Sequence, residues 1–188
     1  MHILLTRHLQ DSKDLIQKLK LNGFKVSNLP LLKVDKVNYS KIELNNFNAI
    51  IFTSSNAIRF LDVKKVNKNI LCFCVGTSTE KTARSNGFFN IFAADGNVRN
   101  LIELVRQNLS PKDNKLLYVS GEVISHPLDK ELISEGYNVV RLIDYTVKYN
   151  ENLDFKFLES LNKDIPNIVY VYSENSAISF LNLIKKYE

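Results

Sequence analysis

The stretch NAIIFTSSNAIRFL at positions 48–61 returns in a similar form as NIVYVYSENSAISFL at positions 167–181. Each copy is an apolar run, then a Ser, then an Asn two residues later, and then a short amphipathic run that ends in Phe-Leu. The apolar run predicts a buried strand, and the polar residues that follow are typical of helix N-caps. The stretch therefore predicts a strand–turn–helix unit, and the chain contains it twice.

The rest of the chain alternates short apolar runs with amphipathic stretches. Glycines follow three of the helical stretches, at Gly23, Gly87 and Gly136, where a left-handed C-cap is expected. This alternation predicts an α/β protein with parallel sheets, and the almost continuous apolar strands indicate sheets covered on both faces. The expected strands are 3–6, 25–29, 49–53, 71–75, 90–93, 116–120, 138–142 and 168–172.

A second repeat links the segment that begins at Ile3 with the segment that begins at Leu116, at a constant offset that also pairs Gly23 with Gly136. The chain thus has the order A, B, A′, B′. After Leu61, segment B continues through further strands and helices to Leu109, whereas only seven residues follow Leu181. By its internal symmetry, the second copy is expected to lack roughly 40 residues, or about two strand–helix units.

The composition excludes some classes of protein. No apolar run approaches the ~20 residues of a membrane helix. The first residues carry no basic region or cleavage site of a signal peptide, so a cytoplasmic protein is expected. Cys72 and Cys74 lie on one apolar strand and predict two buried thiols rather than a zinc site, which needs about four ligands. The net charge of +5 suits nucleic acid or a small acidic substrate, but no Lys/Arg block favours nucleic acid.

The loops after the expected strands are rich in Ser, Thr and Asn, and these loops are where parallel sheets bind ligands. Hydroxyls and free amides at helix N-termini can hold carboxylates or phosphates. Ordinary N-capping is the alternative for any single residue. The glycine-rich motifs of dinucleotide-binding and P-loop proteins are absent from the sequence, and so is the nucleophile elbow of hydrolases.

Seven stretches, in this order and spacing, resemble the uroporphyrinogen-III synthase family. They are ILLTR at 3–7, FTSSNAIRF at 52–60, CVGTSTEKTARSNGF at 74–88, LLYVSGE at 116–122, LDKELISEGYNV at 128–139, DYTV at 144–147 and VYSENSAISF at 171–180.

The resemblance implies two flavodoxin-like parallel-sheet domains that are joined by a two-stranded linker, with the active site in the cleft between them. Residues 1–33 and 148–188 would form a discontinuous domain that is incomplete at its C-terminus. Residues 36–145 would form a complete domain, and PLLKV and DYTVKY would be the linker strands.

The resemblance also implies a function, that of a lyase of heme biosynthesis that needs no metal or cofactor. It would cyclise hydroxymethylbilane, a linear tetrapyrrole with eight carboxylates, to uroporphyrinogen III. Ring D is inverted through a spiro intermediate, and water is lost. Tyr145 is the expected catalytic acid, and the enzyme is expected to be a monomer. The residues expected to bind the substrate are Arg7, Ser54, Ser55, Asn56, Thr77, Ser78, Thr79, Ser120, Gly121 and Ser173.

Two alternatives stay open at this point. A non-catalytic two-lobed α/β protein that binds a small anionic ligand would show the same loops. A nucleic-acid-binding protein would show a salt-sensitive interaction with DNA or RNA.

Overall fold

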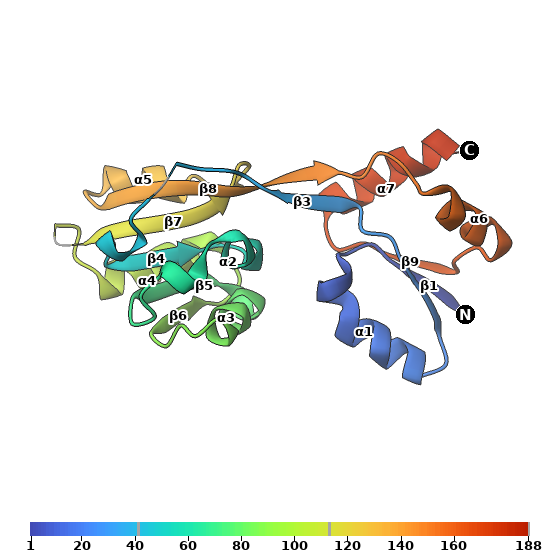
Figure 1. Cartoon of the computed structure of the whole chain (residues 1–188), viewed down its shortest axis with the longest axis horizontal. Coiled ribbons are helices and arrows are strands. Elements are labelled where there is room, and N and C mark those ends of the chain that lie inside the picture. Colours follow the sequence, from blue (N-terminus) through green and yellow to red (C-terminus); the bar gives the residue numbers. More distant parts are fainter. Residues whose placement is uncertain (41, 113, 188) are drawn as a thin grey trace. The chain divides into compact units, whose positions relative to one another are not determined.

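The computed structural model describes residues 1–40, 42–112 and 114–187, and the chain forms two compact units (Figure 1). Unit 1 comprises Met1–Lys33 and Val147–Glu188, and unit 2 comprises Val34–Thr146. The chain therefore crosses from one unit to the other twice. Both sheets contain parallel strands that alternate with helices, which confirms the predicted α/β class.

Unit 2 contains a sheet in the order β3-β8-β7-β4-β5-β6. Its strands are β3 (Leu32–Lys36), β4 (Ala49–Phe52), β5 (Leu71–Val75), β6 (Ile91–Ala94), β7 (Lys115–Gly121) and β8 (Asn138–Tyr149). The five strands from β4 to β8 pair in parallel. Numbered along the chain, these five strands lie in the order 3-2-1-4-5, whereas flavodoxin has the order 2-1-3-4-5. The strand order of this unit therefore differs from that of flavodoxin.

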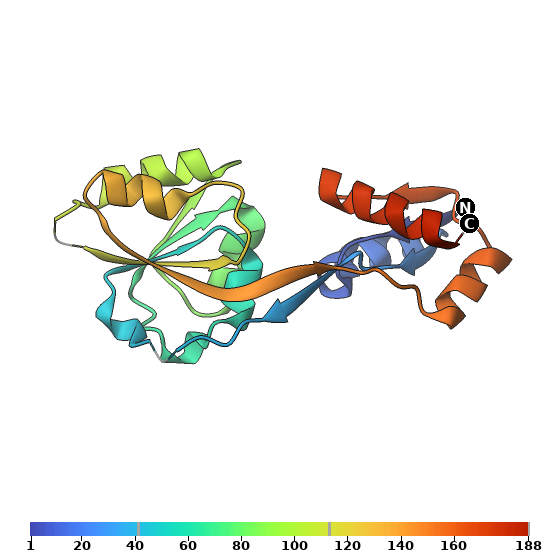
Figure 2. The ribbon, with the colours of Figure 1, turned by 90° about the horizontal axis from the view of Figure 1, so that it is seen from above.

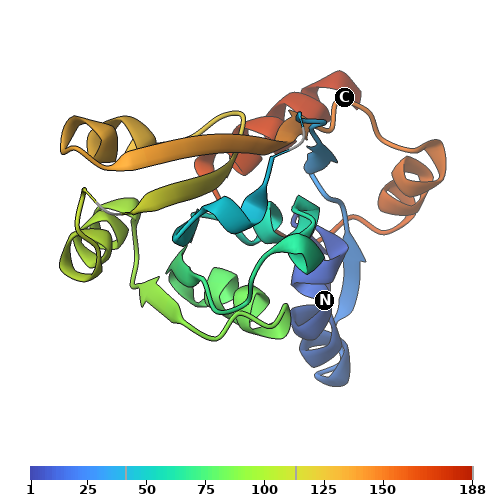
Figure 3. The same ribbon diagram turned by 60° about the vertical axis from the view of Figure 1, so that its left-hand side comes forward.

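The physical reason for this order lies in the faces that the helices cover. Helices α2 (Ser55–Phe60) and α3 (Gly76–Ser85) pack on one face of the sheet, and α4 (Val98–Asn108) and α5 (Leu128–Ser134) pack on the other. Figure 3 shows α2 and α3 together, and Figure 2 shows α4 beside α5. Crossovers between parallel strands are right-handed. A helix on one face of the sheet therefore places the next strand on one side of the previous strand, and a helix on the other face places it on the opposite side. After β6 the chain returns through α4 and adds β7 next to β4.

Unit 1 is a smaller sheet in the order β2-β1-β9, with both pairs of strands parallel. Its core cluster contains four buried leucines, of which Leu183 comes from a helix. The elements of this unit are β1 (His2–Leu5), α1 (Leu9–Leu21), β2 (Lys25–Asn28), α6 (Phe155–Lys163), β9 (Ile168–Tyr170) and α7 (Glu174–Tyr187).

Several local predictions are confirmed. The repeated stretch forms β4–α2 and β9–α7, and the longer repeat forms β1–α1–β2 and β7–α5–β8. Gly23, Gly87 and Gly136 have positive φ after their helices. Cys72 and Cys74 are buried thiols on β5, with sulfurs 3.7 Å apart. Within the described part of the chain, no helix is long and apolar enough to cross a membrane.

Candidate functional site

A cavity of about 600 Å³ opens in unit 2 at the carboxyl ends of the parallel strands. The strand order reverses between β4 and β7, and open α/β sheets bind ligands at such a switch point. The volume lies within the range of about 300–1,000 Å³ that small-molecule sites occupy. The lining residues that follow β4 or belong to β7 and β8 are Thr53, Ser54, Tyr118, Gly121 and Tyr145.

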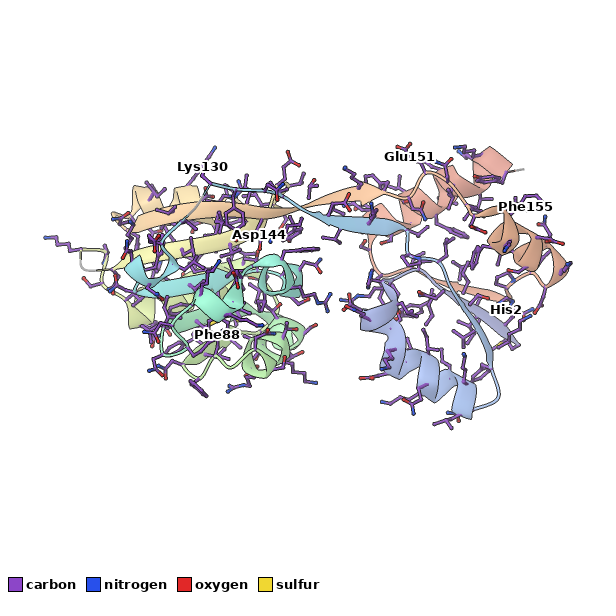
Figure 4. All side chains as sticks on the ribbon, viewed as in Figure 1. His2, Phe88, Lys130, Asp144, Glu151 and Phe155 are labelled. Atoms are coloured by element: carbon purple, nitrogen blue, oxygen red, sulfur yellow. The ribbon has the colours of Figure 1, made fainter. Side chains whose placement is uncertain are left out.

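A β-bulge in β8 brings Tyr145 to this cavity. Ser120 of β7 pairs with Ile143, but the next residue, Gly121, pairs with Tyr145, so Asp144 is the additional residue on β8. Figure 4 labels Asp144 on this strand. Bulges of this kind redirect side chains and are frequent next to active sites.

Gly121 permits the close approach of the Tyr145 ring. A Cβ atom built on Gly121 would lie 2.7 Å from Cε2 and 2.8 Å from Cζ of Tyr145, which is closer than carbon atoms can pack. The backbone N–H of Glu122 donates to the carbonyl of Tyr145 at 2.9 Å. The ring also stacks on Phe60, with 6.2 Å between the ring centroids. The glycine is thus required because a side chain at this position would displace the tyrosine.

Tyr145 is 8% exposed, and its environment keeps the phenol protonated. Burial raises the pKa of Tyr145 above its ordinary value of 10.0, and the Asp144 carboxylate, which is ionised in the alkaline range where Tyr145 titrates, raises it further. Hydrogen bonds with the side chain of Ser54 and the backbone of Gly121 act in the opposite direction. A neutral hydroxyl therefore lies at the cavity at neutral pH.

Two hydroxyls beside Tyr145 form a second polar pair. The Thr53 Oγ1 and Tyr118 Oη atoms lie 3.3 Å apart, and burial raises the pKa of Tyr118. Ser54 is the N-cap of α2, and its Oγ accepts from the backbone N–H of Asn56 at 3.2 Å. This wall of the cavity is neutral and can donate hydrogen bonds.

A second group of lining residues, called here the basic wall, contains an arginine and a histidine. Arg99, in the first turn of α4, and His126, in the loop after β7, both line the cavity. His126 Nε2 lies 2.6 Å from Glu131 Oε2, and the second oxygen of Glu131 accepts from Arg106 at 3.1 Å. The Glu131 carboxylate thus holds the imidazole in place. Arg99 has no side-chain partner among the residues that the structure describes.

The predicted site residues are distributed over several places. Ser54, Gly121 and Tyr145 line the cavity. Ser120 is 1% exposed, and its hydroxyl donates to the Gly121 carbonyl at 3.0 Å, so it lies behind the wall. The other predicted residues of unit 2 are absent from the lining and lie in the first turns of α2 and α3. They are Ser55, Asn56, Thr77, Ser78 and Thr79.

Arg7 and Ser173 belong to unit 1. The Arg7 guanidinium lies 5.4 Å from the ring centroid of Tyr172, and its Nε lies 3.7 Å from the carboxylate of Asp11. The Ser173 Oγ accepts from the backbone N–H of Ser176 at 3.2 Å, as an N-cap does.

Tyr118, Arg99 and His126 line the cavity as well, although they were not predicted as site residues from the sequence. The available signal was their position, since Arg99 and His126 follow the ends of β6 and β7. Loops at the carboxyl ends of parallel strands converge, so a charged residue in any of them is a candidate.

Comparison with known proteins identifies what the chain resembles. The family described as uroporphyrinogen-III synthase HemD matches residues 13–188. No curated protein matches the chain. Among solved structures, the uroporphyrinogen-III synthetase of Helicobacter pylori has 21% identity to this chain and a TM-score of 0.63. The alignment covers 97% of this chain and 78% of the Helicobacter pylori chain. A mutant uroporphyrinogen III synthase of Thermus thermophilus has 14% identity and a TM-score of 0.55, covering 98% and 76%.

Proposed function

The chain belongs to the uroporphyrinogen-III synthase family, and from this premise we propose that the cavity of unit 2 binds the substrate and that Tyr145 is the acid of the reaction. The enzyme is a lyase of tetrapyrrole biosynthesis. It converts hydroxymethylbilane to uroporphyrinogen III, with loss of water and inversion of ring D through a spiro intermediate.

The protonated hydroxyl of Tyr145, facing a cavity at the switch point, is the observation that carries the proposal. When the bond between the hydroxymethyl carbon and its oxygen breaks, the oxygen takes the tyrosine proton and leaves as water. The proton that the substrate releases on final ring closure restores the phenol. A general acid must be protonated before the reaction, and burial keeps the pKa of Tyr145 above 10.0.

The basic wall would hold substrate carboxylates. Arg99 and His126 face the same cavity as Tyr145, so side chains of one substrate molecule can reach both walls. Charge-assisted hydrogen bonds are stronger than neutral ones and fix orientation. Orientation matters here because spiro closure requires one geometry of a flexible chain, and direct closure gives the isomer with ring D not inverted.

The remaining predicted residues are part of the proposal. Ser54 and Gly121 would contact the substrate from the neutral wall, and Ser120 would support them from behind. The other residues would bind carboxylates from the first turns and loops in which they lie. They are Arg7, Ser55, Asn56, Thr77, Ser78, Thr79 and Ser173.

We likewise propose that the chain has two domains. The first is discontinuous and consists of residues 1–33 and 148–188, and the second consists of residues 36–145. PLLKV and DYTVKY would be the linker strands. This organisation is supported by the two compact units and by β3 and β8, each of which contains a unit boundary. A monomeric state and a cytoplasmic location stay predictions.

The reaction is tested by supplying hydroxymethylbilane and measuring the ratio of uroporphyrinogen III to isomer I after oxidation. Isomer I forms spontaneously, so an excess of isomer III is diagnostic of the enzyme. Isomer I alone from folded protein would contradict catalysis by this chain. If such protein still bound the substrate, the result would support the non-catalytic alternative.

Tyr145→Phe tests the acid. We expect kcat to fall about a hundredfold, the lower end of what a general acid contributes. The phenyl ring keeps the packing against Gly121 and Phe60, so folding is preserved. Measurement of kcat for isomer III, with circular dichroism as the folding control, decides the outcome. An unchanged kcat would exclude Tyr145 as the acid.

Arg99→Gln and His126→Gln test the basic wall. Each change removes one positive or hydrogen-bonding group from the cavity, and we expect KM to rise about tenfold, equivalent to about 1.4 kcal/mol. Arg84→Gln is the matched control, because this guanidinium is paired with Glu80 and does not line the cavity. Wild-type KM values in both cavity variants would contradict carboxylate binding at this wall.

A further inference from the structure

Arg141, in the first half of β8, reaches to the end of the neighbouring strand and contacts three consecutive residues there. Its Nε donates to the hydroxyl of Ser120 at 2.8 Å. Its Nη2 donates to the carbonyls of Gly121 at 2.8 Å and Glu122 at 2.9 Å. The fork of the guanidinium therefore holds the whole segment in which β7 ends.

This same segment fixes the position of Tyr145. Gly121 lies under the tyrosine ring, and the N–H of Glu122 donates to the Tyr145 carbonyl. A third contact joins the Glu122 carboxylate to the hydroxyl of Thr146, the residue after the tyrosine, at 2.8 Å. Any movement of the segment would thus move the ring, because the ring and Gly121 are already in van der Waals contact.

The bulge makes such a brace necessary. Between Ser120 and Gly121 the register of β7 and β8 shifts by one residue, so regular pairing is interrupted at this point. The two carbonyls that Arg141 contacts follow this interruption. Arg141 supplies hydrogen bonds where the regular ladder is disrupted.

We propose that Arg141 is a positioning residue for the cyclisation, which holds Ser120, Gly121 and Glu122 so that the Tyr145 hydroxyl points at the leaving group. The inference rests on the proposed function of Tyr145. Arg141 is absent from the lining of the cavity, so it acts through the segment and not on the substrate. Its loss is expected to lower kcat more strongly than it raises KM.

Lysine cannot replace this arginine fully. A lysine ammonium is a single point of charge on a flexible stem, and it cannot contact a hydroxyl and two carbonyls in the fixed geometry of the fork. Arg141→Lys is therefore expected to retain more activity than Arg141→Gln, and less than the wild type.

The experiment is a double-mutant cycle on kcat for uroporphyrinogen III with Arg141→Gln, Tyr145→Phe and the double variant. We expect Arg141→Gln to lower kcat about tenfold and to lower the ratio of isomer III to isomer I. Because Arg141 acts through the tyrosine hydroxyl, the double variant is expected to be no slower than Tyr145→Phe alone. If the reduction of kcat in the double variant equals the product of the reductions in the two single variants, Arg141 acts independently of Tyr145 and the proposal is overturned.

The controls separate three outcomes. A wild-type protein that forms no excess isomer III contradicts the proposed function itself. A normal wild type with an Arg141→Gln variant equal to Arg84→Gln overturns only the role of Arg141. If Arg141→Gln does not fold, Ser120→Ala removes one of its three contacts and keeps both carbonyls. Reduced kcat in folded Ser120→Ala supports positioning, and an unchanged kcat with a lower Tm indicates a purely structural role.

Discussion

At the scale of single residues, Asp144 is an acidic side chain that is buried in unit 2. The residue is fully buried, and its two carboxylate oxygens lack hydrogen-bond partners of good geometry among the described residues. Burial raises the pKa of Asp144 from 3.8 to about 8, and its own N–H and the charge of Lys36 offset this only in part. The folded protein therefore carries a neutral carboxylic acid beside Tyr145 at neutral pH.

This carboxyl predicts a pH dependence of stability. Between about pH 4 and about pH 8 the folded state holds a proton that the unfolded state has released. The free energy of unfolding therefore falls as pH rises, by up to about 1.4 kcal/mol per pH unit from this group. Asp144→Asn keeps the shape and removes the titration. Between about pH 5.5 and about pH 7.5, the free energy of unfolding of the wild type should fall by about 2–3 kcal/mol relative to that of the variant, as measured by urea unfolding.

Asp62→Asn is the matched control for this prediction. Asp62 lies at the surface next to Lys65, whose hydrogen bond lowers the pKa of Asp62. Its contribution to stability is lost only as pH falls through that lowered pKa, so above about pH 5 its profile should follow the wild type. Parallel profiles for Asp144→Asn and the wild type would show that Asp144 is ionised in the folded protein.

At the scale of elements, the sequence predicted where the strands lie better than how they are arranged. Strand β5 has the predicted bounds, and β4 ends one residue earlier than predicted. The hydrophobic periodicity of an element and the residues that cap a helix are local properties, so they can be read from the sequence. The order of strands is not local, because β4, with four buried residues, is apolar on both faces and does not specify which face each crossover takes.

The same limit applies to the site. Tyr145, Ser54 and Gly121 were predicted and line one cavity, but Arg99 and His126 join them only because β7 lies beside β4. Ser120 shows another side of this limit, since it was predicted to bind substrate from the loop after the strand, whereas it lies within β7 and its hydroxyl accepts from Arg141. Bonds between strands, such as this one, depend on register and on the bulge at Asp144, and no pattern of a single strand encodes them.

At the scale of the whole molecule, the two units differ in the size of their cores. The core cluster of unit 1 has four buried residues, Leu4, Leu29, Leu31 and Leu183. Unit 2 has a core cluster on each face of its sheet, and β4 is 0% exposed along its whole length. In unit 1, by contrast, Ile168 and Tyr170 of β9 are 42% and 50% exposed. Because apolar burial is the main stabilising contribution, unit 1 should open at a lower free energy than unit 2.

Amide hydrogen exchange checks this difference in the full chain. We expect amides of β1 and β9 to exchange at least about tenfold faster than those of β4 and β7, since tenfold corresponds to about 1.4 kcal/mol of opening free energy.

Leu183→Ala and Leu101→Ala are the matched substitutions, because both leucines are buried in a helix that covers a sheet. Each should lower local stability by about 2–5 kcal/mol. Leu183→Ala should then accelerate exchange in β1 and β9 while β4 and β7 stay protected. Equal acceleration in all four strands would mean that the two units open as a single cooperative structure, in which the large core of unit 2 stabilises unit 1 as well.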